Sequence, residues 1–117
     1  LITVGRNNIQ NDQLTLRKAA KDDLWLHVRN APGTHVIVKK NQGEITERTI
    51  EEAAGVAAWF SRKAGSLAKV EVDYCPVRNV KKPKGAHPGH VIYEDYSTIL
   101  IEPLDPAQLQ KPPSNQI

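Results

Sequence analysis

The residues best suited to chemistry lie in one segment, residues 77–90, where positive charges are interspersed with glycine and proline. Within residues 74–93 there are four cationic side chains and no Asp or Glu; the four are Arg78, Lys81, Lys82 and Lys84. The remaining residues carry 12 basic and 13 acidic side chains, so this stretch accounts for all of the net charge of +3. Its glycines allow a ligand to approach the backbone amides closely. The segment is therefore predicted to bind phosphate groups, and a solvated loop that is basic only for solubility is the alternative.

A second set of polar and aromatic side chains shares one face of a predicted β-hairpin. Residues 24–29 and 35–39 both alternate apolar and polar positions, and they flank a turn at Pro32-Gly33. The face of the first strand opposite the core then carries Trp25, His27 and Arg29. A register that pairs Val28 with Val36 places His35, Ile37 and Lys39 beside them. Such a patch would bind RNA by stacking on Trp25 and by phosphate contacts, unless Trp25 packs beneath a helix and His27 is a partly buried structural residue.

Catalytic and metal-binding arrangements have little support in the sequence. Asp22 and Asp23 are adjacent, so their side chains point apart, and a role in a turn or a helix cap is expected instead of paired acid and base work. Cys75 is the single cysteine, and no activated-cysteine motif or zinc-ligand spacing surrounds it. The glycine spacing of a nucleotide-binding P-loop is also absent. We therefore expect no enzyme activity, no cofactor and no metal, and a reducing compartment.

The elements that must position these residues begin with a strand at Ile2-Thr3-Val4, which enters a turn at Gly5-Arg6-Asn7-Asn8. In this turn Arg6, Asn7 and Asn8 are predicted to contact the RNA backbone or sugars. Asn11-Asp12 offers an N-cap for a short helix from about Gln13 to Ala20, although Leu14-Thr15-Leu16 also alternates like a strand.

The best helix of the sequence is predicted from Thr46 to Ala64, where apolar residues recur every three or four positions. Thr49 and Glu52 fit a capping box, or Thr46 caps one turn earlier, and Gly65 suits the left-handed position after the helix. The Ala-rich face indicates close packing on a sheet. Three further strands are predicted at Lys69–Cys75, His90–Tyr93 and Ser97–Ile101, the last two joined around Glu94-Asp95. The expected fold is α+β, a mixed and mainly antiparallel sheet of five to six strands with one long and one short helix.

The length of 117 residues suits one domain, which we place at residues 1–103. Residues 104–117 contain several prolines and little apolar pattern, and are predicted to be a disordered tail. The longest stretch without a charged or strongly polar side chain is Ala53–Phe60, which is far too short to span a membrane. Because the chain contains no Met and starts inside a predicted strand, we expect it to be part of a longer protein.

Taken together, six ordered motifs resemble the NFACT-R domain of the RqcH and NEMF family, also labelled fibronectin-binding protein A. The resemblance covers about residues 2–103. The motifs are Gly5-Arg6-Asn7-Asn8 with Asn11-Asp12, Asp23-Leu24-Trp25-Leu26-His27, Pro32-Gly33-Thr34-His35-Val36, Glu52-Ala53-Ala54, Val80-Lys81-Lys82-Pro83-Lys84-Gly85 and Pro88-Gly89-His90-Val91-Ile92-Tyr93.

The resemblance implies an RNA-binding module of a cytoplasmic, ribosome-associated quality-control factor. Such a factor engages tRNA on a stalled large subunit and promotes template-free addition of C-terminal tails, so tRNA, large-subunit rRNA and other domains of the parent protein are the expected partners. The alternative is a protein-binding module that docks on a ribosomal protein or, as the older family label has it, on fibronectin.

Overall fold

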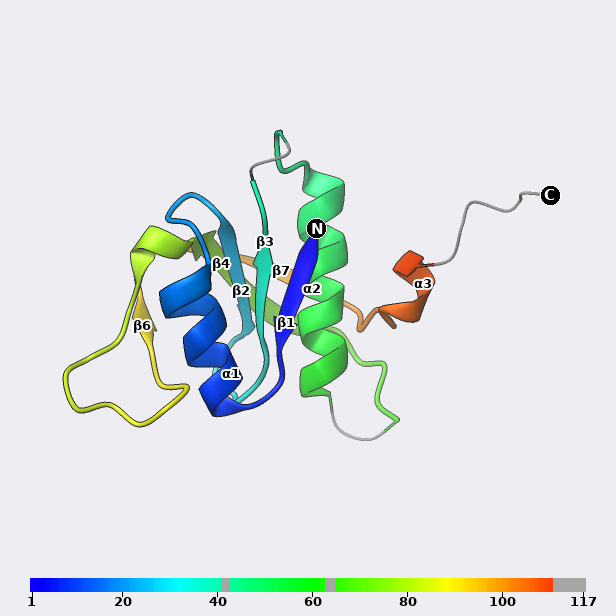
Figure 1. Ribbon diagram of the computed structural model, residues 1–117. Helices are drawn as coiled ribbons and strands as arrows, with labels where there is room; N and C mark the ends of the chain where they lie inside the picture. Colours follow the sequence, from blue (N-terminus) through cyan, green and yellow to red (C-terminus); the bar gives the residue numbers. More distant parts are fainter. Residues whose placement is uncertain (41–42, 63–64, 111–117) are drawn as a thin grey trace.

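The computed structural model describes residues 1–40, 43–62 and 65–110, and it confirms the α+β class (Figure 1). The main sheet has five antiparallel strands in the order β1-β3-β2-β4-β7. These strands are β1 (Ile2–Gly5), β3 (His35–Val38), β2 (Leu24–Val28), β4 (Val70–Pro76) and β7 (Ser97–Ile101). A second sheet pairs β5 (Val80–Lys81) with β6 (Ile92–Tyr93), and the one-turn helix η2 (Val77–Asn79) connects it to β4.

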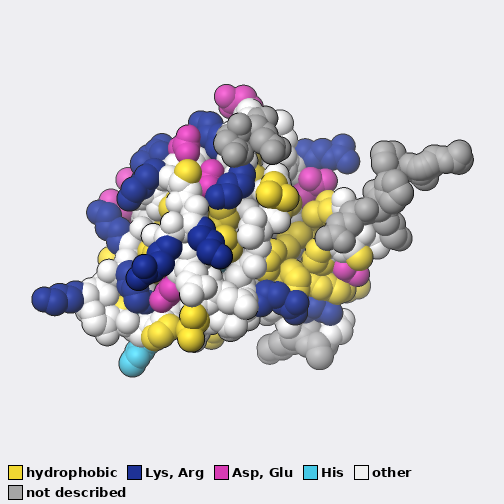
Figure 2. Space-filling view, in the orientation of Figure 1, with side chains coloured by type: hydrophobic (Ala, Val, Ile, Leu, Met, Phe, Trp, Pro, Cys, Tyr) yellow, Lys and Arg dark blue, Asp and Glu magenta, His cyan; other side chains and the backbone are white. Residues whose placement is uncertain are grey.

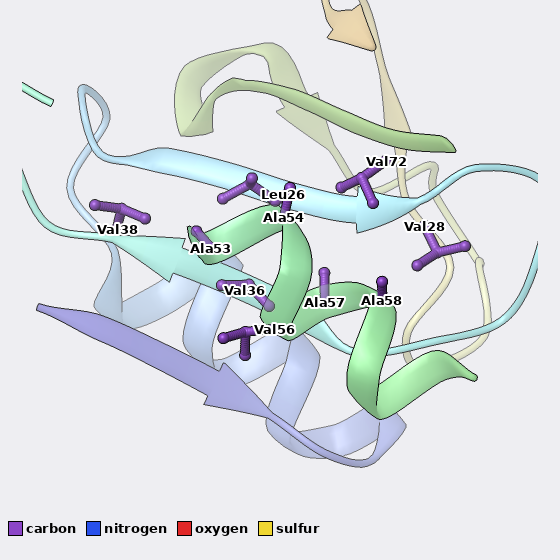
Figure 3. Close-up of a cluster of buried hydrophobic side chains, with 10 residues drawn as sticks. All are labelled: Leu26, Val28, Val36, Val38, Ala53, Ala54, Val56, Ala57, Ala58 and Val72. Carbon is purple, nitrogen blue, oxygen red and sulfur yellow. The ribbon is translucent and has the colours of Figure 1, made fainter. Parts of the chain in front are cut away.

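One face of the main sheet is covered by the long helix α2 (Glu47–Ser61). Its alanines at 53, 54, 57 and 58 are at most 1% exposed and face valines and Leu26 of the sheet (Figure 3). Small side chains let the helix approach the sheet closely, as predicted. Thr46 is the N-cap and accepts a hydrogen bond from the Thr49 backbone N–H at 3.2 Å, so the earlier of the two predicted caps is correct.

The predicted end of this helix is wrong in part. The helix stops at Ser61, and Arg62 is already extended, with its side chain donating to the Trp59 carbonyl at 2.7 Å. Gly65 does have a positive φ of 76°, but it lies beyond the helix end instead of directly after it. Lys63 and Ala64 lie outside the described residues. No helix in the described part of the chain is long and apolar enough to cross a membrane.

The other face of the main sheet is covered by the helical segment 8–18 and by the small sheet (Figure 1). A second core forms here from Leu14, Trp25, Ile37, Cys75, Val77 and Val80. This arrangement matters for function because the predicted RNA-binding face of the hairpin is the face that these elements cover.

The N-terminal helix begins earlier than predicted. Asn7, not Asn11 or Asp12, is the N-cap, and its side chain accepts from the Gln10 N–H at 2.8 Å. Helix α1 (Asn8–Asp12) continues directly into the π-helix η1 (Gln13–Lys18). Asn11 is buried and is used elsewhere: it accepts from the His35 N–H and donates to the Gly33 carbonyl, both at 3.1 Å, so it ties the helix to the hairpin.

The hairpin is confirmed, but its register differs by two residues from the predicted one. Val36 pairs with Leu26, not with Val28. Because side chains alternate with a period of two, the shift leaves every side chain on its predicted face but changes its neighbours. His27 now lies beside His35, with ring centroids 5.3 Å apart.

The C-terminal part also differs from the sequence prediction. Strand β6 pairs with β5 and not with β7. Residues 104–110 belong to the predicted disordered tail, yet the Leu104 N–H donates to the Gly55 carbonyl at 2.9 Å, and α3 (Ala107–Gln110) follows. Leu109 packs against the core cluster to which α2 contributes, an apolar contact that the sequence pattern of this segment did not reveal. Residues 111–117 lie outside the described residues.

Candidate nucleic-acid interface

The basic loop between β5 and β6 is held in shape by one of its own lysines. Lys82 Nζ donates to the carbonyls of His87 at 2.6 Å and His90 at 3.3 Å, and it lies 3.1 Å from Asp12 Oδ2 on α1. The second Asp12 oxygen accepts from the Gly89 N–H at 3.0 Å. A Cβ at Gly89 would lie 2.6 Å from Asn8 Oδ1, and Gly89 also has a positive φ of 85°, so glycine is required here. Lys82 therefore closes the loop on α1, and its predicted role as a phosphate ligand conflicts with these contacts.

The other three predicted cations of residues 77–90 do not form such internal contacts with described acidic groups. Arg78, Lys81 and Lys84 are exposed, and no ion pair between described residues involves them. Arg78 is oriented by its neighbour in space, since its guanidinium and its backbone N–H donate to the Lys21 carbonyl at 3.3 and 3.0 Å. These side chains remain available to an external anion.

The contact between Arg78 and Lys21 extends the basic surface beyond the loop. Arg17 and Lys18 in the last turn of η1 are exposed, as is Lys21 in the turn that follows. Figure 2 shows Lys and Arg side chains gathered over this helical segment and the start of the small sheet. We call the exposed cations Arg17, Lys18, Lys21, Arg78, Lys81 and Lys84 the basic surface. Sequence reasoning missed the first three, although the run Arg17-Lys18-Ala19-Ala20-Lys21 was a visible signal.

One acidic group near the basic surface, Asp23, is neutralised by a lysine. Asp23 is buried and lies 3.2 Å from Lys39 Nζ, and its oxygens accept from the backbone N–H groups of Ala20 and Lys40. Although burial raises the pKa of this carboxyl, these hydrogen bonds and Lys39 lower it more, so the net shift is downward. Lys39 is thus committed to Asp23 and is not counted in the basic surface.

The three residues of the first turn that are predicted to contact RNA have different roles in the structure. The Asn7 side chain is used as the helix cap. The Arg6 guanidinium lies 4.6 Å from the centre of the Phe60 ring, on the α2 side of the sheet. Asn8 is exposed and lines a cavity at the end of the hairpin. Of the three, only Asn8 lies where it could contribute to a site near the loop.

Trp25 is not an exposed stacking platform. Its side chain is 0% exposed and packs in the second core, under the small sheet, with its ring centroid 4.7 Å from that of Tyr93. The alternative, that Trp25 is covered on this face of the sheet, is the one the structure bears out. The cover consists of the helical segment 8–18 together with the small sheet.

His27 and His35 lie next to Trp25 and are also largely withdrawn from solvent. The His27 ring is parallel to Trp25 at 5.7 Å, and His35 Nδ1 lies 2.8 Å from Thr15 Oγ1. Burial lowers the pKa of His27, and burial together with His27 lowers the pKa of His35 to about 3. Both imidazoles are therefore neutral at pH 7, so they do not add to the positive charge of the surface.

Arg29, at the end of the same face, is engaged by neighbours on β4 and by Tyr96. It lies 3.9 Å from Glu71 and 4.0 Å from Asp73, and it donates to the Tyr96 hydroxyl at 3.3 Å. Asp73 is 1% exposed and accepts from the hydroxyls of Tyr93 and Thr98. Burial and the Asp73 carboxylate both raise the pKa of Tyr93. The arrangement anchors the small sheet to the main sheet, and Arg29 is only partly free to contact RNA.

The groups considered for catalysis are not brought together. Cys75 is buried, and burial, with Asp73, raises its pKa to about 11, which disfavours the thiolate. Asp22 is exposed whereas Asp23 is tied to Lys39. Among the described residues no group of three or more His, Cys, Asp or Glu side chains is placed to hold a metal ion.

Comparisons with known proteins identify relatives of this chain. A family model described as the NFACT protein RNA binding domain matches residues 1–95. The protein called Rqc2 homolog RqcH in Bacillus subtilis is 49% identical over 102 residues, which cover 87% of this chain and 17% of the relative. The protein of the same name in Streptococcus pneumoniae is 39% identical over 104 residues, covering 88% of this chain and 18% of that protein. The chain thus spans less than a fifth of the length of these relatives.

A solved structure is similar in fold as well as in sequence. It is the C-terminal part of the fibronectin/fibrinogen-binding protein from Streptococcus suis, with a TM-score of 0.81 and 37% sequence identity. The match covers 90% of this chain and 41% of that chain.

Proposed function

The chain belongs to the NFACT protein RNA binding domain family, and from this premise we propose that it is the RNA-binding module of a ribosome-associated quality-control factor of the RqcH type. The observation that carries the proposal is the basic surface. Its cations come from two segments far apart in sequence, joined by the hydrogen bonds from Arg78 to Lys21. Phosphate contacts require exposed cations that are not already paired with acidic groups of the protein.

The finer assignment is that the bound RNA is tRNA or large-subunit rRNA, and that the module supports template-free tailing of stalled nascent chains in the cytoplasm. The similarity to two RqcH proteins supports this assignment. We further propose that the domain binds without catalysing a reaction. The buried, weakly acidic Cys75 and the separation of Asp22 from Asp23 support that view.

The test is a titration of the chain with fluorescently labelled total tRNA and with duplex RNA at 50 and 200 mM salt. We count four of the six cations of the basic surface as phosphate contacts, namely Lys21, Arg78, Lys81 and Lys84. Each releases about 0.7–0.9 counterions, which predicts a roughly 50- to 150-fold loss of affinity over this range. The double variant Arg78→Ala/Lys81→Ala keeps two of these contacts, so its affinity for RNA should fall only about 7- to 12-fold between about 50 and 200 mM salt.

A matched control removes the same charge elsewhere. Arg48 is on α2, 87% exposed, and Lys69 is exposed just before β4. The double variant Arg48→Ala/Lys69→Ala is expected to keep the salt dependence of the parent chain. Equal salt dependence in both double variants would show that the proposed surface does not contact phosphate.

A protein-binding role is the second candidate, because the similar solved structure is of a fibronectin/fibrinogen-binding protein. Leu100, on the edge strand β7, is 60% exposed. It pairs with Glu71 near the start of β4, whereas Arg78 of the basic surface follows the end of β4. Binding of immobilised fibronectin that is insensitive to salt and is abolished by Leu100→Asp, with no RNA binding, would favour this role over the first.

A further inference from the structure

A cavity of about 500 Å³ opens at the end of the β2–β3 hairpin. Its wall is formed by the hairpin, by the end of the basic loop at residues 89–91, and by the start of α1. The side chains that matter here are those of Asn8, Trp25, His27, His35 and Tyr93. The volume lies within the range of about 300–1,000 Å³ that is usual for sites that bind small organic groups.

The lining is aromatic and contains an unused polar atom. The Trp25 and His27 rings are parallel to within 1°, and His35 stands edge-on to both. The buried Trp25 Nε1–H has no hydrogen-bond partner within the described residues, although leaving a buried donor unpaired is costly.

The lining is also uncharged. Because the pKa values of His27 and His35 are lowered, both rings are neutral at pH 7 and each offers one donor and one acceptor. The nearest loop lysine, Lys82, is paired with Asp12 instead of facing an anion. The cavity therefore suits a flat, uncharged heteroaromatic ring and is a poor place for a phosphate group.

The cavity and the basic surface share the chain segment from β5 to β6. Residues 89–91 line the cavity, whereas Lys81 at the end of β5 and Lys84 in the loop that follows are exposed cations. An RNA backbone that contacts these lysines can turn one of its bases toward the hairpin. This geometry exists only where the base is not stacked in a helix.

We infer that the cavity receives one unstacked nucleobase of the RNA that the basic surface holds. The inference rests on the proposed function. Since Trp25 is fully buried, the base would contact His27 and Tyr93, which retain partial exposure. Hydrogen bonds with the His27 imidazole and the Asn8 side-chain amide would orient the base. Stacking of one base contributes about 5- to 150-fold in affinity.

The experiment compares octaadenylate with an abasic ribose-phosphate chain of the same length, at one salt concentration. The protein is the chain with Trp59→Phe, so that Trp25 is its single tryptophan and reports on the cavity by fluorescence. We expect octaadenylate to bind about 5- to 150-fold more tightly than the abasic chain and to change the Trp25 emission, which the abasic chain leaves unchanged.

Two variants locate the effect. Ala31 is exposed at the lip of the cavity, so Ala31→Phe fills the opening without disturbing the core, and Ala107→Phe on α3 is the matched control. Ala31→Phe should reduce the affinity for octaadenylate to that for the abasic chain, whereas Ala107→Phe should leave the difference intact. His27→Leu should likewise reduce the affinity for octaadenylate to that for the abasic chain, and its melting temperature shows whether it folds.

The failures of the two proposals are distinguishable. Equal affinity of the parent chain for octaadenylate and for the abasic chain would overturn the base pocket while leaving phosphate binding in place. An affinity difference that survives Ala31→Phe would also overturn it. No binding of either oligomer at 50 mM salt would overturn the proposed RNA-binding function itself.

Discussion

Replacing Lys82 by Ala should destabilise the domain and leave its phosphate contacts largely unchanged, although Lys82 is one of four cations in the same loop. The lysine makes two hydrogen bonds to loop carbonyls and one ion pair to Asp12. The two side chains are 27% and 19% exposed, so solvent screens the pair only in part. Hydrogen bonds to a charged group contribute about 1.5–3 kcal/mol, and we expect Lys82→Ala to lower the free energy of unfolding by about 2 kcal/mol.

The expected change is measured by urea unfolding and by thermal melting. At about 4 °C per kcal/mol for a domain of this size, a loss of about 2 kcal/mol lowers the melting temperature by about 8 °C. Lys84→Ala is the matched control because Lys84 is exposed and has no ion pair among the described residues. It should change stability by less than about 0.5 kcal/mol and should lower the salt slope of RNA binding by about 0.7–0.9.

A double-mutant cycle separates the ion pair from the other contacts of Lys82. Asp12→Ala removes the carboxylate that holds both Lys82 and the Gly89 N–H. The double variant should lose less than the sum of the single variants, with a coupling energy of about 1 kcal/mol. The reasoning is refuted if Lys82→Ala keeps the melting temperature of the parent chain and lowers the salt slope as Lys84→Ala does.

Three further changes probe the core, the histidines and the C-terminal segment. Trp25→Ala should cost about 3–5 kcal/mol in urea unfolding because the ring is fully buried, whereas an exposed stacking platform would lose less than about 1 kcal/mol. Because the pKa of His35 is about 3 when folded and near 6.5 when unfolded, the unfolded chain binds the extra proton between these values, so stability falls as pH is lowered from 6.5 toward 3. His35→Asn should flatten this decline by up to about 1.4 kcal/mol per pH unit in unfolding curves, and an unchanged slope would contradict a buried neutral imidazole. Gly55→Ala should release the segment that begins at Leu104, since a Cβ at Gly55 would lie 2.6 Å from Leu104 Cβ, and faster proteolysis after residue 102 without global unfolding is the expected readout; unaltered proteolysis would argue against this packing.

Local patterns in the sequence were sufficient to predict most of the elements. Strict alternation located the hairpin strands because a half-buried strand must present one apolar face. The alanine-rich stripe of α2 predicted close packing on the sheet, and Thr46 was among the predicted caps. Register was not predictable, because shifting a hairpin by two residues leaves its apolar pattern unchanged.

The sequence predicted several residues of the candidate site but not which of them lie together or pair inside the molecule. Charge counting found the basic loop, yet it could not tell that Lys82 is used inside the molecule. It also missed Arg17, Lys18 and Lys21, because the contact between Lys21 and Arg78 forms only when the end of β4 lies beside the turn after η1. Trp25 and His27 were assigned to the correct face, but which elements cover that face was left open.

The amino-acid sequence by itself determined the family, the class of fold and the concentration of positive charge in one loop, since these depend on residue type and near spacing. Only the tertiary structure decided which cations are free to bind RNA and which rings line a cavity. The physical reason is that exposure and ion pairing depend on residues far apart in the chain, such as Asp12 with Lys82 and Trp25 with Tyr93. No local sequence pattern encodes those contacts. The Lys82–Asp12 pair fixes the basic loop on α1, and the packing of Tyr93 on Trp25 forms part of the aromatic cavity beside that loop.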